Sequence, residues 1–332
     1  MKRRTLLRLG GSAAAAAATT ALGTAPARAG VGDGSTFMAW KGVTGDQRIW
    51  WSSLQGGGDY WSGPQPIDGA FGSHGVALAG PSGGNALHMT WKGVEGDERI
   101  WWNRFDGNTW AGPQPVPGAN SSVGPALAPY AGVFMAWKGV AGDERIWWNS
   151  YFRGWTGPQV VPGANTSFAP AVAVNHIGSY GEPHMVWKGV AGDQRVWWSI
   201  YRGGDSGADN WTGPQPIDGA FTSAGVALAG TVGGGLHMAW KGVEGDQRIW
   251  WSRLYPSASS WTTPQPVPGA NTSTGPALAV YGGWVHMTWK GVAGDERIWW
   301  NRIYRDSGTW TGPQPIDGDN TSFRPALATI GL

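Results

Sequence analysis

Short apolar segments alternate with turn-forming residues along most of this chain. Between residues 276 and 316, apolar runs at 276–280, 285–289, 297–301 and 310–316 are separated by Gly, Pro, Asn or Asp. Runs of this length with such boundaries are typical of β-strands. Gly, Pro, aromatic and β-branched residues dominate outside the N-terminus, which favours an all-β fold with many turns.

The four-segment pattern belongs to a long internal repeat. The string W-K-G-V-x-G-D-x-R-I/V-W-W occurs six times, at intervals of 46 to 53 residues. Its copies start at Trp40, Trp91, Trp137, Trp187, Trp240 and Trp289. A unit of four antiparallel strands in about 50 residues is typical of a β-propeller blade. The sequence therefore predicts a six-bladed β-propeller.

The two ends of the chain predict that the ring is closed. The repeats begin with a second strand at 36–40 and finish with a first strand at 325–329. The C-terminal strand is expected to complete the first blade, which removes exposed sheet edges. Repeats one and four share I-D-G-A-F, at 67–71 and 217–221, so an alternative is two tandem β-trefoils. A repeat divided between the termini favours the propeller.

Loop lengths indicate which face carries a site. The Trp that starts the motif lies eight residues before its Arg in all six repeats, and the fourth-segment Trp lies 15 residues before the next first strand. The connection from third to fourth segment varies from 7 to 13 residues. In a propeller both constant loops emerge on one face, here called the uniform face. A repeated site is expected there.

The loop 41–48 carries the candidate chemistry. Gly42 and Gly45 are expected to allow positive φ, and Asp46 to bond Lys41 or Arg48. The Arg fork can donate to vicinal hydroxyls, the preceding Gln or Glu can accept from them, and the first Trp of each pair can stack on a sugar. The candidate ligand-binding residues are Arg48, Arg99, Arg145, Arg195, Arg248, Arg297, Gln47, Glu98, Glu144, Gln194, Gln247, Glu296, Trp50, Trp101, Trp147, Trp197, Trp250 and Trp299. The alternative is that Asp46 staples the hairpin to Lys41 or Arg48 and that both Trp rings are core between blades.

The N-terminus predicts export. Residues 1–29 combine the pair Arg3-Arg4, an Ala-rich apolar stretch and an A-x-A site ending at Ala29, which are typical of a twin-arginine signal peptide. We expect the domain to occupy 30–332, secreted and without disulfides, since Cys is absent. Cleavage removes five basic residues and leaves 19 basic against 22 acidic ones, which argues against a nucleic-acid partner. No later run of 18 apolar residues predicts a membrane span.

Catalysis and metal binding are not favoured. A polar set repeated six times lacks the asymmetry of an active site, and the four His residues that precede Met lack a second ligand at metal spacing. Segments 106–110 and 305–310 resemble the Asp-box turns of sialidase propellers, so a glycosidase stays open. A protein-binding scaffold is the other alternative. No cofactor is expected, and a monomer is expected.

From about Asp33 to Leu332 the chain resembles bacterial and fungal β-propeller lectins: the fungal fucose-specific type and the Photorhabdus-type and tectonin-like propellers. The resemblance rests on W-x-G-x-x-x-D-x-R-I-W-W followed by W-x-x-P. It implies glycan partners, no enzymatic activity, and sugar sites between blades built from the Arg48, Gln47/Glu98 and Trp50 series. Two departures limit it: the fucose-lectin pattern has a further Glu after the Arg with no repeated equivalent here, and Photorhabdus-type propellers usually have seven blades.

Overall fold

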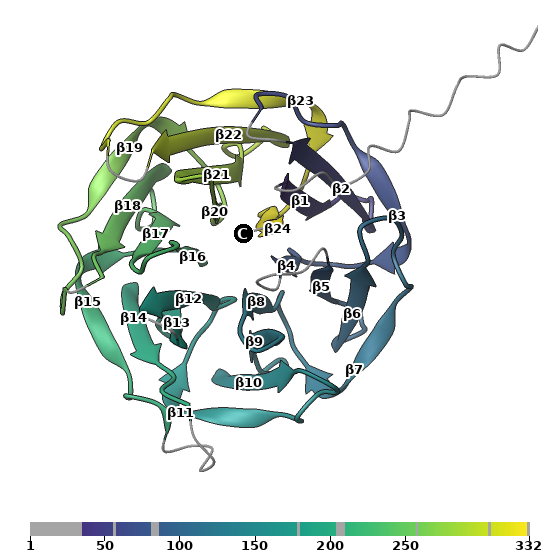
Figure 1. The fold of residues 1–332 in the computed structure, drawn as a ribbon, viewed down its shortest axis with the longest axis horizontal. Helices are drawn as coiled ribbons and strands as arrows, with labels where there is room; N and C mark the ends of the chain where they lie inside the picture. Colours follow the sequence, from purple (N-terminus) through teal and green to yellow (C-terminus); the bar gives the residue numbers. More distant parts are fainter. Residues whose placement is uncertain are drawn as a thin grey trace, which may run out of the picture. The chain divides into compact units, whose positions relative to one another are not determined.

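The computed structural model describes residues 35–55, 58–80, 86–177, 180–203, 210–256, 258–304 and 307–330. The expected signal peptide, residues 1–29, lies outside these ranges. All 24 named elements in the described ranges are β-strands, and they belong to the unit Val31–Leu332. They form six separate four-stranded antiparallel sheets arranged in a ring (Figure 1). The predicted six-bladed propeller is confirmed, and the tandem trefoil is wrong.

The blades follow one another along the chain, each running from an inner first strand to an outer fourth strand. Blade 1 contains β24 (Ala326–Ile330), β1 (Ser35–Lys41), β2 (Arg48–Gln55) and β3 (Gln65–Phe71). Blade 2 contains β4 (Ala77–Ala79), β5 (Leu87–Lys92), β6 (Arg99–Phe105) and β7 (Gln114–Asn120). Blade 3 contains β8 (Ala126–Pro129), β9 (Val133–Lys138), β10 (Arg145–Tyr151) and β11 (Gln159–Asn165).

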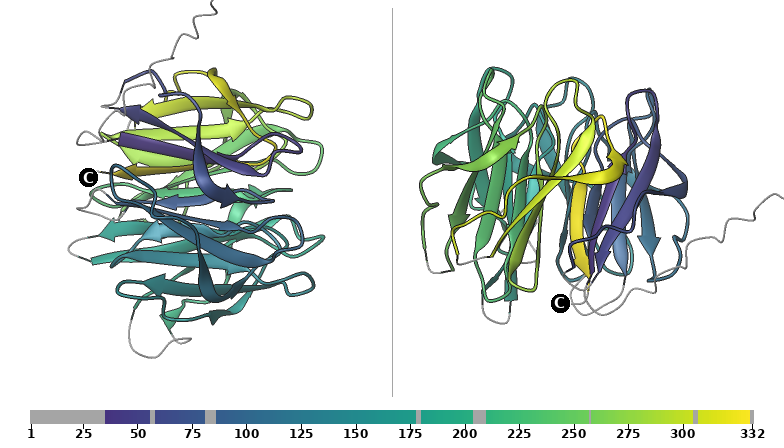
Figure 2. Two further views of the ribbon diagram at one scale, coloured as in Figure 1. Left: turned by 90° about the vertical axis from the view of Figure 1, so that its right-hand side faces the viewer. Right: turned by 90° about the horizontal axis from the view of Figure 1, so that it is seen from above.

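The second half of the ring repeats this order. Blade 4 contains β12 (Ala171–Ile177), β13 (Tyr180–Lys188), β14 (Arg195–Ile200) and β15 (Gln215–Phe221). Blade 5 contains β16 (Val226–Gly230), β17 (Leu236–Lys241), β18 (Arg248–Leu254) and β19 (Gln265–Asn271). Blade 6 contains β20 (Ala277–Tyr281), β21 (Trp284–Lys290), β22 (Arg297–Tyr304) and β23 (Gln314–Asn320). Seen from the side, the strands run between the two faces of the ring (Figure 2).

Ring closure is built as predicted. β24 pairs antiparallel with β1, from Ser35 opposite Ile330 to Ala39 opposite Ala326. On the uniform face the closure is reinforced by side chains: Thr321 Oγ1 donates to the Lys41 carbonyl at 2.7 Å, and Lys41 Nζ donates to Ser322 Oγ at 2.8 Å. The last strand therefore covers the inner edge of β1 and joins both ends of the chain in one blade.

The fourth strand of the repeat starts later than predicted. The apolar pattern predicts it over 310–316, but β23 spans Gln314–Asn320, and Trp310 makes only an isolated bridge to Ile303. The reason is local: Gly312 has φ of 99° and Pro313 has no N–H, so the segment around them cannot form a ladder. The strand starts after the proline.

The core lies between blades. The motif's first tryptophans are at most 1% exposed, and each lies in an apolar cluster formed by two neighbouring blades. Trp91, for example, packs in one cluster with Ile49, Ile67 and Ala70 from blade 1. Burial of a large aromatic ring stabilises by about 3 kcal/mol, so these six rings hold the blades together.

Candidate functional site

The repeated geometry of the motif is a carboxylate that locks an arginine over a tryptophan. In blade 2, Asp97 Oδ1 accepts from the Arg99 backbone N and Nε at 3.0 and 2.8 Å, and Oδ2 accepts from Arg99 Nη2 and Trp101 Nε1 at 3.0 and 2.9 Å. The Arg99 Cζ lies 4.8 Å from the centroid of the Trp101 ring. The guanidinium is thus fixed by two hydrogen bonds and stacked on an indole, which restricts its rotamers before any ligand arrives.

All six blades repeat this arrangement. The Nε–Oδ1 distances are 2.8 to 2.9 Å, and the Arg Cζ lies 4.6 to 4.9 Å from the Trp centroid. The Arg side chains are 52 to 57% exposed. Of the five N–H donors of each guanidinium, two bind the carboxylate and the other three have no protein acceptor among the described residues. Each blade presents the same oriented cation to solvent.

Two glycines make the carboxylate position possible, for different reasons. At Gly93 an added Cβ would lie 2.4 Å from Asp97 Oδ2, so this position must lack a side chain to admit the carboxylate. Gly96 has φ of +81°, with open space around it, and serves the turn. Positive φ was expected at both Gly42 and Gly45. It occurs at Gly45, with φ of +87°, whereas the requirement at Gly42 is space beside Asp46.

Electrostatics favours a permanently ionised pair. Hydrogen bonds from Arg99, then from the Trp101 indole and the Arg99 amide, lower the pKa of Asp97 to about 2 against the effect of burial. The same bond raises the pKa of Arg99. The carboxylate keeps its charge at any neutral pH and has four donors on its two oxygens. It is suited to holding the arginine and unsuited to proton transfer.

Four of the six Gln and Glu residues of the candidate set bond the next blade. Gln47 Oε1 accepts from the Glu95 amide at 3.2 Å, and Glu98 Oε1 accepts from the Ala141 amide at 3.0 Å. Gln194 bonds the Glu244 amide at 3.0 Å, and Glu296 bonds the Thr44 amide at 3.0 Å and its hydroxyl at 2.7 Å. These side chains therefore link neighbouring uniform-face loops across the gap between blades.

Because of this link, the three candidate residues of one repeat do not lie together. Gln47 of blade 1 contacts the loop of blade 2 that leads to Arg99, and Trp101 packs on the cluster shared by blades 1 and 2. This contact therefore places the Gln or Glu of one blade beside the loop that leads to the Arg and Trp of the following blade. The structure brings Arg and Trp of one repeat together, but not the adjacent Gln or Glu.

The motif lysines are structural. Each ammonium donates to a serine in the loop arriving from the preceding blade, at 2.7 to 3.0 Å. In blade 2 the pair is Lys92 with Ser73. Of the two expected staples, Asp46 to Lys41 or to Arg48, the structure contains the pair with Arg48, whereas Lys41 bonds Ser322 between blades.

One class of site residue was missed by the sequence reasoning. The residue opposite each Arg on the fourth strand lies on the same face of the sheet. It is Phe71 opposite Arg48 and Phe221 opposite Arg195, both 47% exposed, and Asn in the other four blades. The alternation of I-D-G-A-F with endings in Asn was the signal for it. The candidate sites thus fall into a Phe class and an Asn class.

Other polar groups serve the scaffold. The imidazoles of His88, His184, His237 and His286 lie on second-strand positions and stack on the second Trp of each pair, at 5.7 to 6.3 Å between centroids. Asp106 accepts from the amides of Asn108 and Thr109 and so caps a turn, while residues 305 and 306 of the second Asp-box-like segment lie outside the described ranges. The described residues contain no cluster of His, Asp and Glu that could hold a metal ion. No helix in the described part is long and apolar enough to cross a bilayer.

Comparison with solved structures places the fold among known propellers. The fucose-specific lectin from Aleuria aurantia matches with a TM-score of 0.61 and 15% identity, over 88% of this chain and 98% of that one. AofleA from Arthrobotrys oligospora matches with a TM-score of 0.60 and 10% identity, over 89% of both chains. A point mutant of the Aleuria aurantia lectin in complex with alpha-methyl-L-fucoside matches with a TM-score of 0.59 and 15% identity, over 87% and 97%. No family model and no curated protein matches the sequence. At these identities the likeness concerns the fold, and it confirms the expected resemblance at that level.

Proposed function

We propose that this protein is a secreted, non-catalytic carbohydrate-binding protein with glycan sites in the clefts of the uniform face. The observation that carries the proposal is the sixfold Asp–Arg–Trp unit, with its half-exposed, fixed guanidinium. Three free N–H groups can donate to vicinal hydroxyls, and the exposed part of the indole can contact the C–H face of a sugar. Repetition on a rigid ring would add avidity for multivalent glycans.

Several features support binding without catalysis. The Asp of each unit is held ionised and fully hydrogen-bonded, so it offers no general acid. In the clefts that contain Glu98 and Glu296, the carboxylate bonds the neighbouring loop. Solved structures with similar folds include a fungal lectin in complex with alpha-methyl-L-fucoside, which makes this sugar a sensible first probe among many.

The test is a glycan array followed by calorimetry on a hit. We expect more than one site per chain, and Arg99→Ala should lower the stoichiometry by one, because it removes a single cleft. Arg153→Ala is the matched control, since Arg153 is an exposed arginine in the connection between third and fourth strands. No binding to any glycan, a stoichiometry of one, or an Arg99→Ala protein identical to wild type would overturn the proposal.

Export through the twin-arginine route, with cleavage near Ala29 and a mature monomer from residue 30, is part of the same proposal. It rests on Arg3-Arg4 and the A-x-A site. N-terminal sequencing of protein from the culture medium checks it. Replacing Arg3 and Arg4 with Lys should retain the protein in the cytoplasm, and unchanged secretion of that variant would contradict the twin-arginine route.

A further inference from the structure

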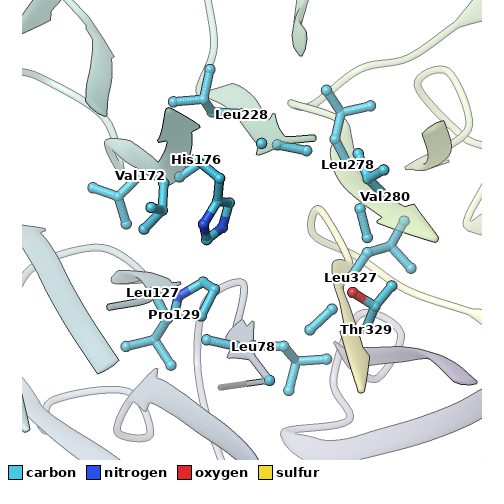
Figure 3. A pocket seen from close by; sticks show the side chains of 18 residues that line it. Leu78, Leu127, Pro129, Val172, His176, Leu228, Leu278, Val280, Leu327 and Thr329 are labelled. Carbon is cyan, nitrogen blue, oxygen red and sulfur yellow. The ribbon is translucent and has the colours of Figure 1, made fainter. Parts of the chain in front are cut away.

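The centre of the ring contains an asymmetric cavity that the repeated clefts do not explain. The inner strands line a narrow channel, mainly with apolar side chains such as Leu78, Leu127 and Leu228, together with His176 and Thr329 (Figure 3). Towards the uniform face, beyond this channel, the loops that join the blades surround a wider cavity of about 770 Å³. Here it is called the mouth cavity. Its size is within the range of small-molecule sites.

The only charged side chain at its position in the six loops, Arg324, breaks the symmetry of this cavity. Five of the six loops have Gly or Ala immediately before the Val or Pro that leads into the first strand, namely Gly75, Gly124, Ala169, Gly225 and Gly275. The sixth has Arg324, which reaches from blade 1 to blade 5 and donates from Nη1 to the Val226 carbonyl at 3.0 Å. The small residues make room for it: a Cβ added at Gly75 would lie 3.1 Å from Arg324 Cγ.

The guanidinium of Arg324 is a cation without a counter-ion. Among the described residues it forms no ion pair, and the Val226 carbonyl is its one hydrogen-bond acceptor. Burial lowers the pKa of Arg324 to about 10, so it is still charged at neutral pH. A partly buried charge in this state is costly unless an anion pairs with it.

The walls define what kind of anion fits. Phe323 and Phe168 line the cavity from the loops of blades 1 and 4, and the His74 ring lies 5.1 Å from the Phe323 ring. The ammonium groups of Lys188 and Lys241 add positive charge, although serines already hold them. The exposed Glu244 at the rim disfavours a polyanion.

We propose that the mouth cavity binds one small monocarboxylate with an apolar or aromatic body. The carboxylate would pair with the free edge of Arg324, whose planar fork matches it, and the body would pack against the Phe walls. This site is single, central and anion-selective. It is independent of the six proposed glycan clefts, which are repeated and lie between blades.

The test uses benzoate, phenylacetate, indole-3-acetate and 2-naphthoate, each with its neutral amide, on the full mature chain. Ligand-observed NMR identifies binders, and calorimetry measures them. We expect at least one acid to bind with a stoichiometry of one and at least tenfold more tightly than its amide. Arg324→Met, which keeps the stem and removes the charge, should abolish this preference, and Arg324→Lys should keep part of it.

Arg324→Gly is the folding control, because it recreates the Gly-Pro pair already present at Gly124-Pro125 and Gly275-Pro276. All Arg324 variants should bind array glycans as wild type does, whereas Arg99→Ala should leave carboxylate binding unchanged. The inference is overturned if no acid binds at millimolar concentration, if acids and amides bind equally, or if Arg324→Met retains the preference. None of these results bears on the glycan clefts.

Discussion

Replacing Asp319 with alanine should stabilise the protein, and more so as pH rises. Asp319 is 1% exposed, and neither carboxylate oxygen has a hydrogen-bond partner among the described residues. The five equivalent positions are buried alanines. One of these, Ala70, lies in an apolar cluster with Ile49 and Trp91. The acid therefore occupies a site that the scaffold builds for a methyl group.

The magnitude follows from the ionisation of this carboxyl. Burial raises the pKa of Asp319 from 3.8 to about 7. Between these values the unfolded chain releases a proton that the folded chain keeps, so stability falls as pH rises from about 4 to about 7 and is level above. At 1.36 kcal/mol per pKa unit, the loss is about 4 kcal/mol. Removing the carboxyl should recover this amount at pH 8 and little of it at pH 4.

The assay is equilibrium denaturation of wild type, Asp319→Ala and Asp319→Asn from pH 4 to 9, compared at each pH so that other groups cancel. Asp319→Asn should lose the same pH dependence while keeping a buried polar group. Asp317→Asn, on the exposed side of the same strand, is the control and should change stability little. A difference between wild type and Asp319→Ala that does not grow between pH 4 and 8 would refute the reasoning.

Three further outcomes are expected. Burial lowers the pKa of His286 to about 4, so the free energy of unfolding of the wild type should fall by about 3 kcal/mol as pH falls from 6.5 to 4. Two repeats have Phe at this position, and His286→Phe should remove that loss in acid denaturation. Gly93→Ala should push Asp97 off Arg99, costing about 1–3 kcal/mol in denaturation and one glycan site in calorimetry. Phe71→Asn converts a Phe-class cleft to the Asn class, so it should change the array profile of one class without lowering total stoichiometry.

Much of the fold could be predicted because its information is local and repeated. Strand-length apolar runs, constant turns and a repeat divided between the termini are sufficient for six blades and ring closure. The fourth strand was misplaced because the apolar content of 310–316 hides a positive-φ Gly312 and an N–H-less Pro313, which prevent pairing. Backbone geometry at these two residues, and not the apolar pattern, determines where the fourth strand starts.

The candidate site was predicted less completely. Asp97, Arg99 and Trp101 follow one another at intervals of two residues and lie in one hairpin, so their contact can be predicted from the sequence spacing. The contact of Gln47 with the next blade cannot be predicted from spacing. Successive residues of an extended chain point in opposite directions, and the arrangement of blades in the ring determines which blade each side chain contacts. Phe71 was missed for a related reason: strand register, not sequence distance, places it opposite Arg48.

Asp319, near the end of β23, and Arg324, in the connection that follows, lie five residues apart, and both depart from the repeat. The other five connections make the same Lys–Ser bond without either residue, so neither charge is needed to close the ring. Departures from local rules that bring no structural gain are typical of functional sites. Only Arg324 faces a cavity, however, and Asp319 is absent from its lining. Asp319→Ala should therefore raise stability and leave carboxylate affinity unchanged in calorimetry, whereas a parallel change in both would mean that the two charges act together.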